Sequence, residues 1–149
     1  MPRILVVDDD RLIRTLLTSI FEMHGVECVT AGDGEEALRR LGDGRFDLML
    51  LDLMMPGLDG FGVLEALART GRPHPPIMIA TAASASVIER IRPFRIAAIL
   101  AKPFDVDELV GTARELLRHE QLARSMRIVR IEPRAAELPR FRRLRMPFG

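Results

Sequence analysis

The sequence predicts an α/β fold in which helices cover both faces of a five-stranded parallel sheet. Five short apolar runs divide the first hundred residues, and helical patterns of apolar residues lie between and after them. The runs are mostly apolar throughout rather than alternating, which is typical of parallel strands that are covered on both faces. Regular alternation of strand and helix favours a parallel sheet with right-handed crossovers.

The elements follow in a simple order. We expect strands at residues 4–7, 26–29, 48–51, 77–80 and 96–100. Apolar residues at helical spacing predict helices across residues 13–21, 37–41, 61–67 and 109–117. Glycine and proline clusters separate several of these segments, as in Pro56-Gly57. A further helix near residues 86–91 has the weakest pattern, because Pro93 ends it early.

Length and composition limit the possible classes of protein. A chain of 149 residues is long enough for one domain with its own core. No apolar run approaches the roughly 18 residues of a membrane span, and we expect neither a signal peptide nor a membrane partner. The single cysteine, Cys28, excludes a disulfide framework and a cysteine zinc site, which fits a cytoplasmic location.

Charge is distributed unevenly along the chain. Residues 1–120 have a net charge of −5, whereas residues 121–149 carry eight arginines and a net charge of +6. We expect a domain over residues 3–120, followed by an Arg-rich and flexible tail over residues 121–149. That tail could be a frayed extension of the last helix, or it could bind an acidic partner, nucleic acid or the domain's own acidic surface.

Polar residues follow four of the expected strands. They are Asp8, Asp9 and Asp10 after the first strand, Asp52 after the third, Thr81 after the fourth and Lys102 after the fifth. Because the ends of parallel strands meet at one edge of a sheet, these side chains should converge. Clustered carboxylates repel one another unless a cation lies among them, and hard oxygen ligands suit Mg²⁺. Asp10 is also a good candidate for the N-cap of the first helix.

Lys102 is the only lysine in a chain with twenty-one arginines. Lysine places a compact ammonium on a flexible stem, whereas arginine presents a broad planar fork. The position of this single ammonium at a strand end favours a role as a point charge for an oxyanion.

Four stretches of the sequence carry a specific resemblance. They are ILVVDDD at 4–10, DLMLLDLMMPGLDG at 47–60, IMIATA at 77–82 and AILAKPFD at 98–105. Together they resemble the response-regulator receiver domains of two-component signalling, over residues 3 to about 120. The resemblance implies a flavodoxin-like, doubly wound sheet with the strand order 2-1-3-4-5 and an architecture similar to that of the chemotaxis regulators.

The resemblance also implies a role for each residue of the cluster. Asp52 would be the phosphoacceptor, Thr81 would donate its hydroxyl to the phosphoryl group, and Lys102 would pair with a phosphoryl oxygen. Such a protein is not an enzyme with a separate substrate, because it catalyses only its own phosphorylation and dephosphorylation.

The implied metal is Mg²⁺, and its implied ligands come from four residues. Asp9 would bind the ion directly and Asp8 through water, with Asp52 and the backbone carbonyl of Met54 completing the set.

The sequence follows the receiver pattern closely but departs from it at one position. The resemblance implies a cis peptide before Pro103. Receivers commonly carry tyrosine or phenylalanine three residues before the lysine, and this chain has Ile99 there. The usual movement of an aromatic side chain on activation is therefore in doubt.

The implied partners are a sensor histidine kinase or histidine phosphotransfer protein and an output protein that the sequence does not identify. About 29 residues follow the domain, too few for an independent core, so we expect a stand-alone receiver without a C-terminal DNA-binding domain. A weak dimer is possible.

Two other functions are compatible with parts of the sequence. A constitutive binding or adaptor module acting through the Arg-rich tail is favoured by Ile99 and by the tail itself. A phosphohydrolase of the haloacid dehalogenase type would use Asp8 as its nucleophile, with Asp10 in its first motif. That class needs a second acidic pair at a later strand end, but Asp105 and Asp107 lie at a helix start.

Overall fold

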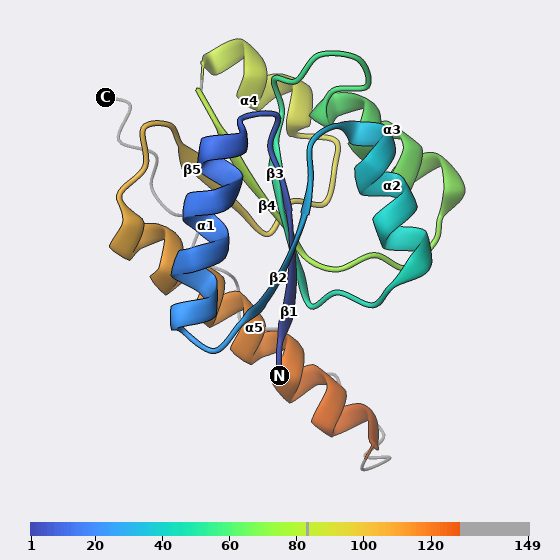
Figure 1. Ribbon diagram of the computed structural model, residues 1–149. Helices are drawn as coiled ribbons and strands as arrows, with labels where there is room; N and C mark the ends of the chain where they lie inside the picture. The colour runs from blue at the N-terminus through green and yellow to red at the C-terminus, as the bar shows by residue number, and fades with distance from the viewer. Residues whose placement is uncertain (83, 129–149) are drawn as a thin grey trace.

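A computed structural model describes residues 1–82 and 84–128 of the chain. Strands and helices alternate throughout (Figure 1). The strands are β1 (Arg3–Val7), β2 (Glu27–Ala31), β3 (Leu48–Asp52), β4 (Ile77–Thr81) and β5 (Ala98–Ala101). The helices are α1 (Arg11–Met23), α2 (Gly34–Asp43), α3 (Gly60–Thr70), α4 (Ala85–Ile91) and α5 (Val106–Ile128).

All of the strand pairs are parallel, and the strand order is β2-β1-β3-β4-β5. The predicted sheet and its strand order are therefore confirmed. Two strands begin later than expected because the apolar residues before them pack against the interior without joining the sheet. Val26 lies in the turn after α1, where its N–H donates to the Phe21 carbonyl at 3.0 Å, and Ile96 packs against the core ahead of β5.

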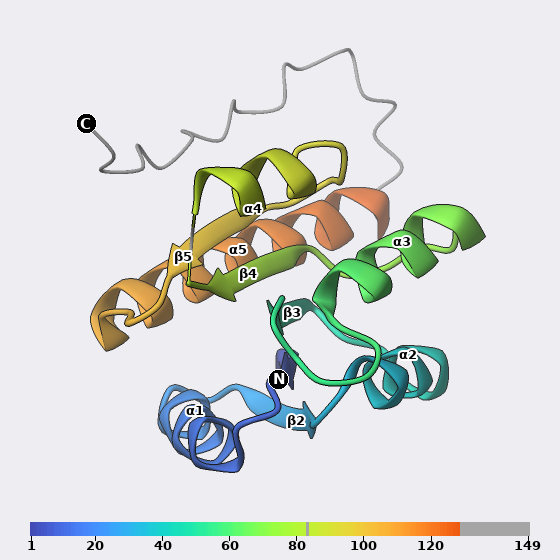
Figure 2. The ribbon, with the colours of Figure 1, turned by 90° about the horizontal axis from the view of Figure 1, so that it is seen from above.

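Helices α1 and α5 lie on one side of the sheet and α2, α3 and α4 on the other (Figure 2). The core consists of two apolar layers, one on each face of the sheet. Alternate strand residues point to opposite faces, so that Ile4 packs with α1 and α5 while Leu5 packs with α2 and α3. Phe21 of α1 and Phe61 of α3 are among the large side chains that fill these layers. Both faces are covered, as the apolar strands predicted.

Gly60 sets how closely α3 approaches the end of β3. Its N–H donates to the Leu53 carbonyl at 3.0 Å, and a Cβ at residue 60 would collide with the Asp52 carbonyl and the Leu53 Cα. Only glycine allows this approach. The backbone that follows Asp52 is consequently held in place by the first turn of α3.

Helix α5 continues to Ile128, so the domain boundary expected at residue 120 lies inside it. Beyond that point Arg124 reaches back to Asp47, the residue before β3, and forms an ion pair with its carboxylate. The backbone N–H of Arg3 donates to the other oxygen of Asp47 at 2.7 Å. The last turns of α5 are thus attached to the amino edge of the sheet, opposite the strand ends that carry Asp8 and Asp52.

No helix among residues 1–82 and 84–128 is both long enough and apolar enough to cross a membrane. The Arg-rich segment after Ile128 lies outside the described residues, so its expected flexibility stays a prediction.

Arg124→Ala should lower the free energy of unfolding by about 1–3 kcal/mol, because the buried Asp47 carboxylate would keep only its backbone partner. Chemical denaturation measures this change. Arg92→Ala is the matched control, since Arg92 pairs with Glu89 at 2.8 Å on an exposed surface, where ion pairs contribute little. Equal effects of the two substitutions would show that Arg124 does not anchor α5.

Candidate functional site

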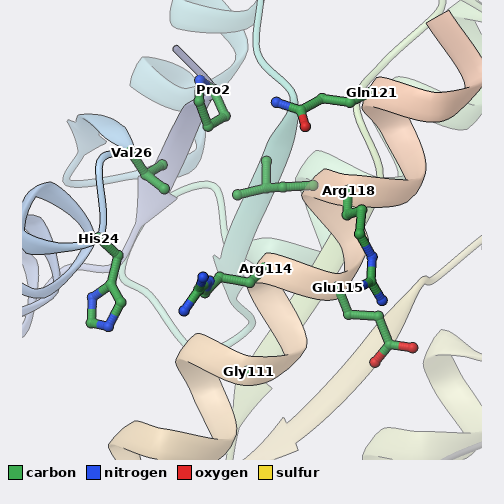
Figure 3. A pocket seen from close by; sticks show the side chains of 9 residues that line it. Pro2, His24, Val26, Gly111, Arg114, Glu115, Arg118 and Gln121 are labelled. Carbon is green, nitrogen blue, oxygen red and sulfur yellow. The ribbon is translucent and has the colours of Figure 1, made fainter. Parts of the chain in front are cut away.

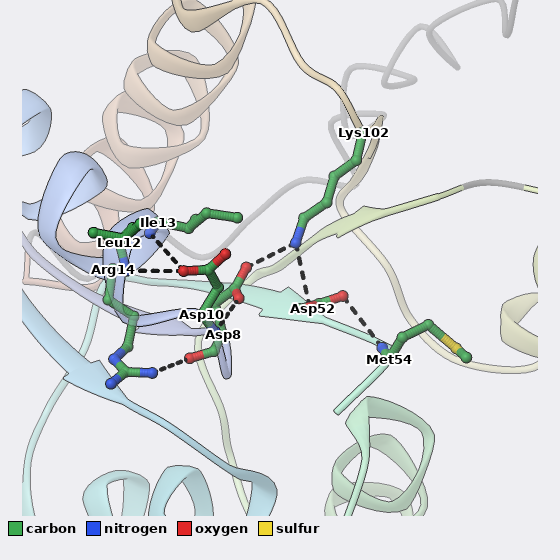
Figure 4. A network of polar contacts seen from close by, with 8 residues as sticks. All are labelled: Asp8, Asp10, Leu12, Ile13, Arg14, Asp52, Met54 and Lys102. Atoms are coloured by element: carbon green, nitrogen blue, oxygen red, sulfur yellow. Dashed lines mark hydrogen bonds and ion pairs between the residues drawn. The ribbon is translucent and has the colours of Figure 1, made fainter. Parts of the chain in front are cut away.

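The carboxyl edge of the sheet brings together the side chains predicted to converge there. Asp8 follows β1, Asp52 ends β3, Thr81 ends β4 and Lys102 follows β5. Figure 4 shows Asp8, Asp52 and Lys102 turned toward one another. The peptide bond between Lys102 and Pro103 is cis, as expected.

The Lys102 ammonium joins the two buried carboxylates. Its Nζ lies 2.8 Å from Asp8 Oδ2 and 3.3 Å from Asp52 Oδ2. Burial alone would lower the pKa of the Lys102 ammonium, but the hydrogen bond to Asp8 and the charges of Asp52 and Asp8 raise it above its ordinary value. The side chain is therefore charged at neutral pH. The sequence predicted that Lys102 lies at this edge, but it did not predict direct contacts of Lys102 with both carboxylates.

Asp8 is fixed by contacts to both its side chain and its backbone. Its Oδ1 accepts a hydrogen bond from the Asp10 N–H at 2.9 Å, and its carbonyl accepts one from Arg14 Nη1 at 2.7 Å. Asp10 caps α1 by accepting from the Leu12 and Ile13 N–H groups, as predicted. The sequence analysis missed Arg14, because an arginine on a helix face carries no signal that distinguishes it from a solvated one.

Asp52 is buried, with 6% of its surface exposed. Its Oδ1 accepts a hydrogen bond from the Met54 N–H at 3.2 Å. Burial raises the pKa of the Asp52 carboxyl above its ordinary value, because desolvation outweighs the opposing effects of Lys102 and the Met54 N–H. The site therefore stabilises the charged form of this carboxylate less well than water does.

Thr81 has an exposed surface of 0%, and its hydroxyl has no hydrogen-bond partner among the described residues. Its backbone carbonyl accepts from the Lys102 N–H at 2.8 Å, so Thr81 and Lys102 lie side by side at the strand ends. Buried hydroxyls are nearly always paired. An unpaired one at this edge could donate to a ligand oxygen.

The cluster also has the composition of a site for a divalent cation. Asp8, Asp9 and Asp52 each offer a carboxylate oxygen, and these oxygens lie within 4.8 Å of one another. Three carboxylates beside one ammonium leave a net charge of about −2 when all are ionised. Asp9 is exposed and accessible to an ion from solvent. Hard oxygen donors with this excess charge fit Mg²⁺.

Two further residues flank the cluster. The Met54 side chain is exposed, while its backbone N–H is held by Asp52. Ile99 pairs with Ile79 across β4 and β5, and its partly buried side chain packs against the core on the α3 and α4 face. The side chain at this position is thus seated in an apolar layer.

Comparison with known proteins places most of the chain within one family. The family model described as the response regulator receiver domain matches residues 4–114. The transcriptional regulatory protein CpxR of Escherichia coli is 42% identical over 120 residues, which cover 79% of this chain and 50% of CpxR. The chain therefore matches about half the length of this curated relative.

Solved structures agree with this match. The receiver domain of the Francisella response regulator 1452 superposes with a TM-score of 0.73 and 33% identity, covering 80% of this chain and 98% of that domain. The response regulator TrrA of Thermotoga maritima, solved in complex with Mg²⁺ and BeF, gives a TM-score of 0.69 and 35% identity. That alignment covers 78% of this chain and 99% of TrrA.

Asp52→Asn should raise the free energy of unfolding at pH 7 by about 1 kcal/mol when EDTA removes divalent cations. The raised pKa of Asp52 means that the folded state holds its proton more tightly than the unfolded state does. Ionised Asp52 therefore destabilises the fold at neutral pH, and this penalty fades as the pH falls through the folded-state pKa. Chemical denaturation of wild type and variant between pH 7 and pH 4 measures the difference in their free energies of unfolding.

Asp9→Asn is the matched control, because the Asp9 side chain is exposed to solvent, so little change in stability is expected at either pH. A lower stability of Asp52→Asn than of wild type at pH 7 would contradict the account of this carboxylate.

Proposed function

Because the chain belongs to the response regulator receiver domain family, we propose that it accepts a phosphoryl group on Asp52 and signals through altered partner binding. The donor would be a sensor histidine kinase or a histidine phosphotransfer protein. The observation that carries the proposal is the set of contacts at the carboxyl edge, in which one ammonium bridges two buried carboxylates beside an unpaired buried hydroxyl.

Each residue contributes one part of the proposed transfer. A carboxylate oxygen of Asp52 would attack phosphorus and form an acyl phosphate, as the bond from phosphorus to the donor's histidine nitrogen breaks. The Lys102 ammonium, already within 3.3 Å of Asp52 Oδ2, would bind a phosphoryl oxygen and neutralise part of its charge. The Thr81 hydroxyl would then gain an acceptor that the described residues do not offer it.

Mg²⁺ would be held by Asp9 directly, by Asp8 through water, by Asp52, and by the backbone carbonyl of Met54. When bound, it would supply positive charge to the phosphoryl oxygens and offset the repulsion among the carboxylates. The donor oxygens around Asp8, Asp9 and Asp52 support this assignment. The complex of TrrA with Mg²⁺ and BeF gives further support, because TrrA is 35% identical to this chain.

The proposed signal would pass through the segment between β4 and α4. Helix α4 has seven residues and buries only Ile91, and its N-cap Ser84 lies three residues after Thr81. Arg90 lies over the Phe61 ring at 3.7 Å from its centroid, which gives α4 a contact to α3. A helix with so few buried residues can move when the Thr81 hydroxyl turns to a phosphoryl oxygen.

The alternatives have no comparable support among the described residues. A phosphohydrolase with Asp8 as its nucleophile would need a second acidic pair at a later strand end. Asp105 accepts from the Asp107 and Glu108 N–H groups at the start of α5 and so acts as a cap. The adaptor function would depend mainly on the Arg-rich segment after Ile128, which lies outside the residues that the structure describes. The output partner, a weak dimer and a cytoplasmic location stay predictions.

Labelling with a small phosphodonor tests the proposal. Incubated with acetyl phosphate and Mg²⁺, wild type should gain one hydroxylamine-labile phosphoryl group. The positive charges of Mg²⁺ and Lys102 would then offset the negative charges of the carboxylates and of the phosphoryl group. Asp52→Asn should gain none, and EDTA should abolish labelling of wild type. Intact-mass spectrometry measures the product. Asp33→Asn, at the cap of α2, is a matched control that should label normally; equal labelling of Asp52→Asn would contradict the assignment.

Ile99 should keep its rotamer when the site is occupied. Isoleucine is stiff at its branched carbon, and this side chain packs in an apolar layer, so turning it outward would bring no polar contact. Methyl NMR of Ile99 with and without Mg²⁺ and beryllofluoride should show displacement of the segment after Thr81 without a change of rotamer. A clear change of rotamer at Ile99 would refute this mode of coupling.

A further inference from the structure

A groove of about 680 Å³ lies at the amino edge of the sheet, on the side opposite the strand ends that carry Asp52. It runs between α5 and the segment that joins α1 to β2, with Pro2 at one end (Figure 3). A groove of this volume is comparable to a binding pocket for a small ligand or for a few side chains of a peptide. Nothing in the proposed phosphoryl chemistry uses it.

Two guanidinium groups line this groove without a partner of opposite charge. Arg114 and Arg118 are one helical turn apart on α5 and have exposed side chains, and neither forms an ion pair within residues 1–82 and 84–128. His24 faces them from the end of α1, with its Nδ1 bound to the Ile20 carbonyl at 2.8 Å (Figure 3). Glu115 supplies the single carboxylate of the lining. The groove therefore presents an excess of positive charge, although residues 1–120 carry a net charge of −5.

The lining of the groove also includes apolar side chains. Val26 and Leu117 form part of its wall. Met1 and Met23, which precede the lining residues Pro2 and His24, have exposed fractions of 86% and 83%. Methionine adapts its shape to different apolar partners and is common at binding surfaces. Two exposed and adaptable apolar residues thus adjoin, along the chain, the lining of a groove whose arginines form no ion pair among the described residues.

The groove is also held in a fixed shape. Arg124, one turn beyond the lining residue Gln121, is bound to Asp47 and attaches α5 to the base of β3. On the other side Val26 is buried, and the Glu27 N–H donates to the Pro2 carbonyl at 2.9 Å. A preformed surface loses little conformational entropy when a partner binds.

We propose that this groove binds an acidic amphipathic segment of a partner protein. Carboxylates on such a segment would pair with Arg114 and Arg118, and its apolar side chains would cover Met23 and the wall of the groove. The charge excess selects an anionic partner, and the exposed methionines favour a peptide over nucleic acid, whose backbone has no apolar side chains. Because the groove and Asp52 lie at opposite edges, binding does not require phosphorylation.

Fluorescence anisotropy with a labelled synthetic peptide tests the proposal on the full-length protein. The peptide carries Glu and Leu at the spacing of an amphipathic helix, and a second peptide has Lys in place of each Glu. Wild type should bind the acidic peptide and not the basic one. Arg114→Glu combined with Arg118→Glu should weaken binding by about tenfold or more, because attraction becomes repulsion.

Arg39→Glu combined with Arg69→Glu is the matched control. It makes the same change in net charge on exposed positions of α2 and α3, far from the groove, and should leave binding within about twofold. Met23→Ser should weaken binding a few-fold, which tests the apolar part separately. All variants should be phosphorylated by acetyl phosphate as wild type is. A wrong assignment of the groove can therefore be distinguished from a wrong assignment of Asp52 as the phosphoacceptor.

Three results would overturn the proposal. One is no saturable binding of the acidic peptide to wild type below about 1 mM, the limit of weak recognition. Another is an equal loss of binding in both double variants, which would indicate a response to net charge alone. The third is tight binding of a single-stranded polyuridine that Arg114→Glu with Arg118→Glu abolishes, which would make the groove a nucleic-acid site.

Discussion

The bridge from the Lys102 ammonium to Asp8 and Asp52 is the interaction on which the site depends. The two buried carboxylates repel each other. The Lys102 ammonium, 2.8 Å from Asp8 Oδ2 and 3.3 Å from Asp52 Oδ2, offsets only part of this repulsion. With Asp9 beside them, the cluster holds more negative than positive charge. Burial, with a smaller contribution from the charge of Asp8, raises the pKa of Asp52. The deficit of positive charge favours the divalent cation that we propose.

The remainder of the fold keeps these charges in place. Two apolar layers hold the parallel strands in register, so that β1, β3, β4 and β5 all end at one edge. Local contacts then fix individual side chains, as Arg14 does for the Asp8 backbone and as Gly60 does for the backbone after Asp52. The stability of the apolar layers offsets the cost of the charged edge, which is common where a site is built for chemistry rather than for stability.

Much of this arrangement could be predicted from the sequence, because its causes are local or periodic. Apolar runs predicted the strands, and the motifs around Asp8, Asp52 and Lys102 led to the strand order through resemblance. Contacts between distant residues could not be predicted in the same way. Arg124 was assigned to a tail, yet it pairs with Asp47 and belongs to the packed helix α5, because the charge pattern that marks a tail also fits the last turns of a helix.

The most direct test of the account is to locate the phosphoryl group on the protein after reaction with acetyl phosphate and Mg²⁺. Reduction of an acyl phosphate with borohydride converts the modified aspartate into homoserine, which peptide sequencing by mass spectrometry can place at one residue. We predict homoserine at position 52 and at no other aspartate. Homoserine at position 8, or modification spread over several exposed carboxylates with position 52 unchanged, would contradict the account.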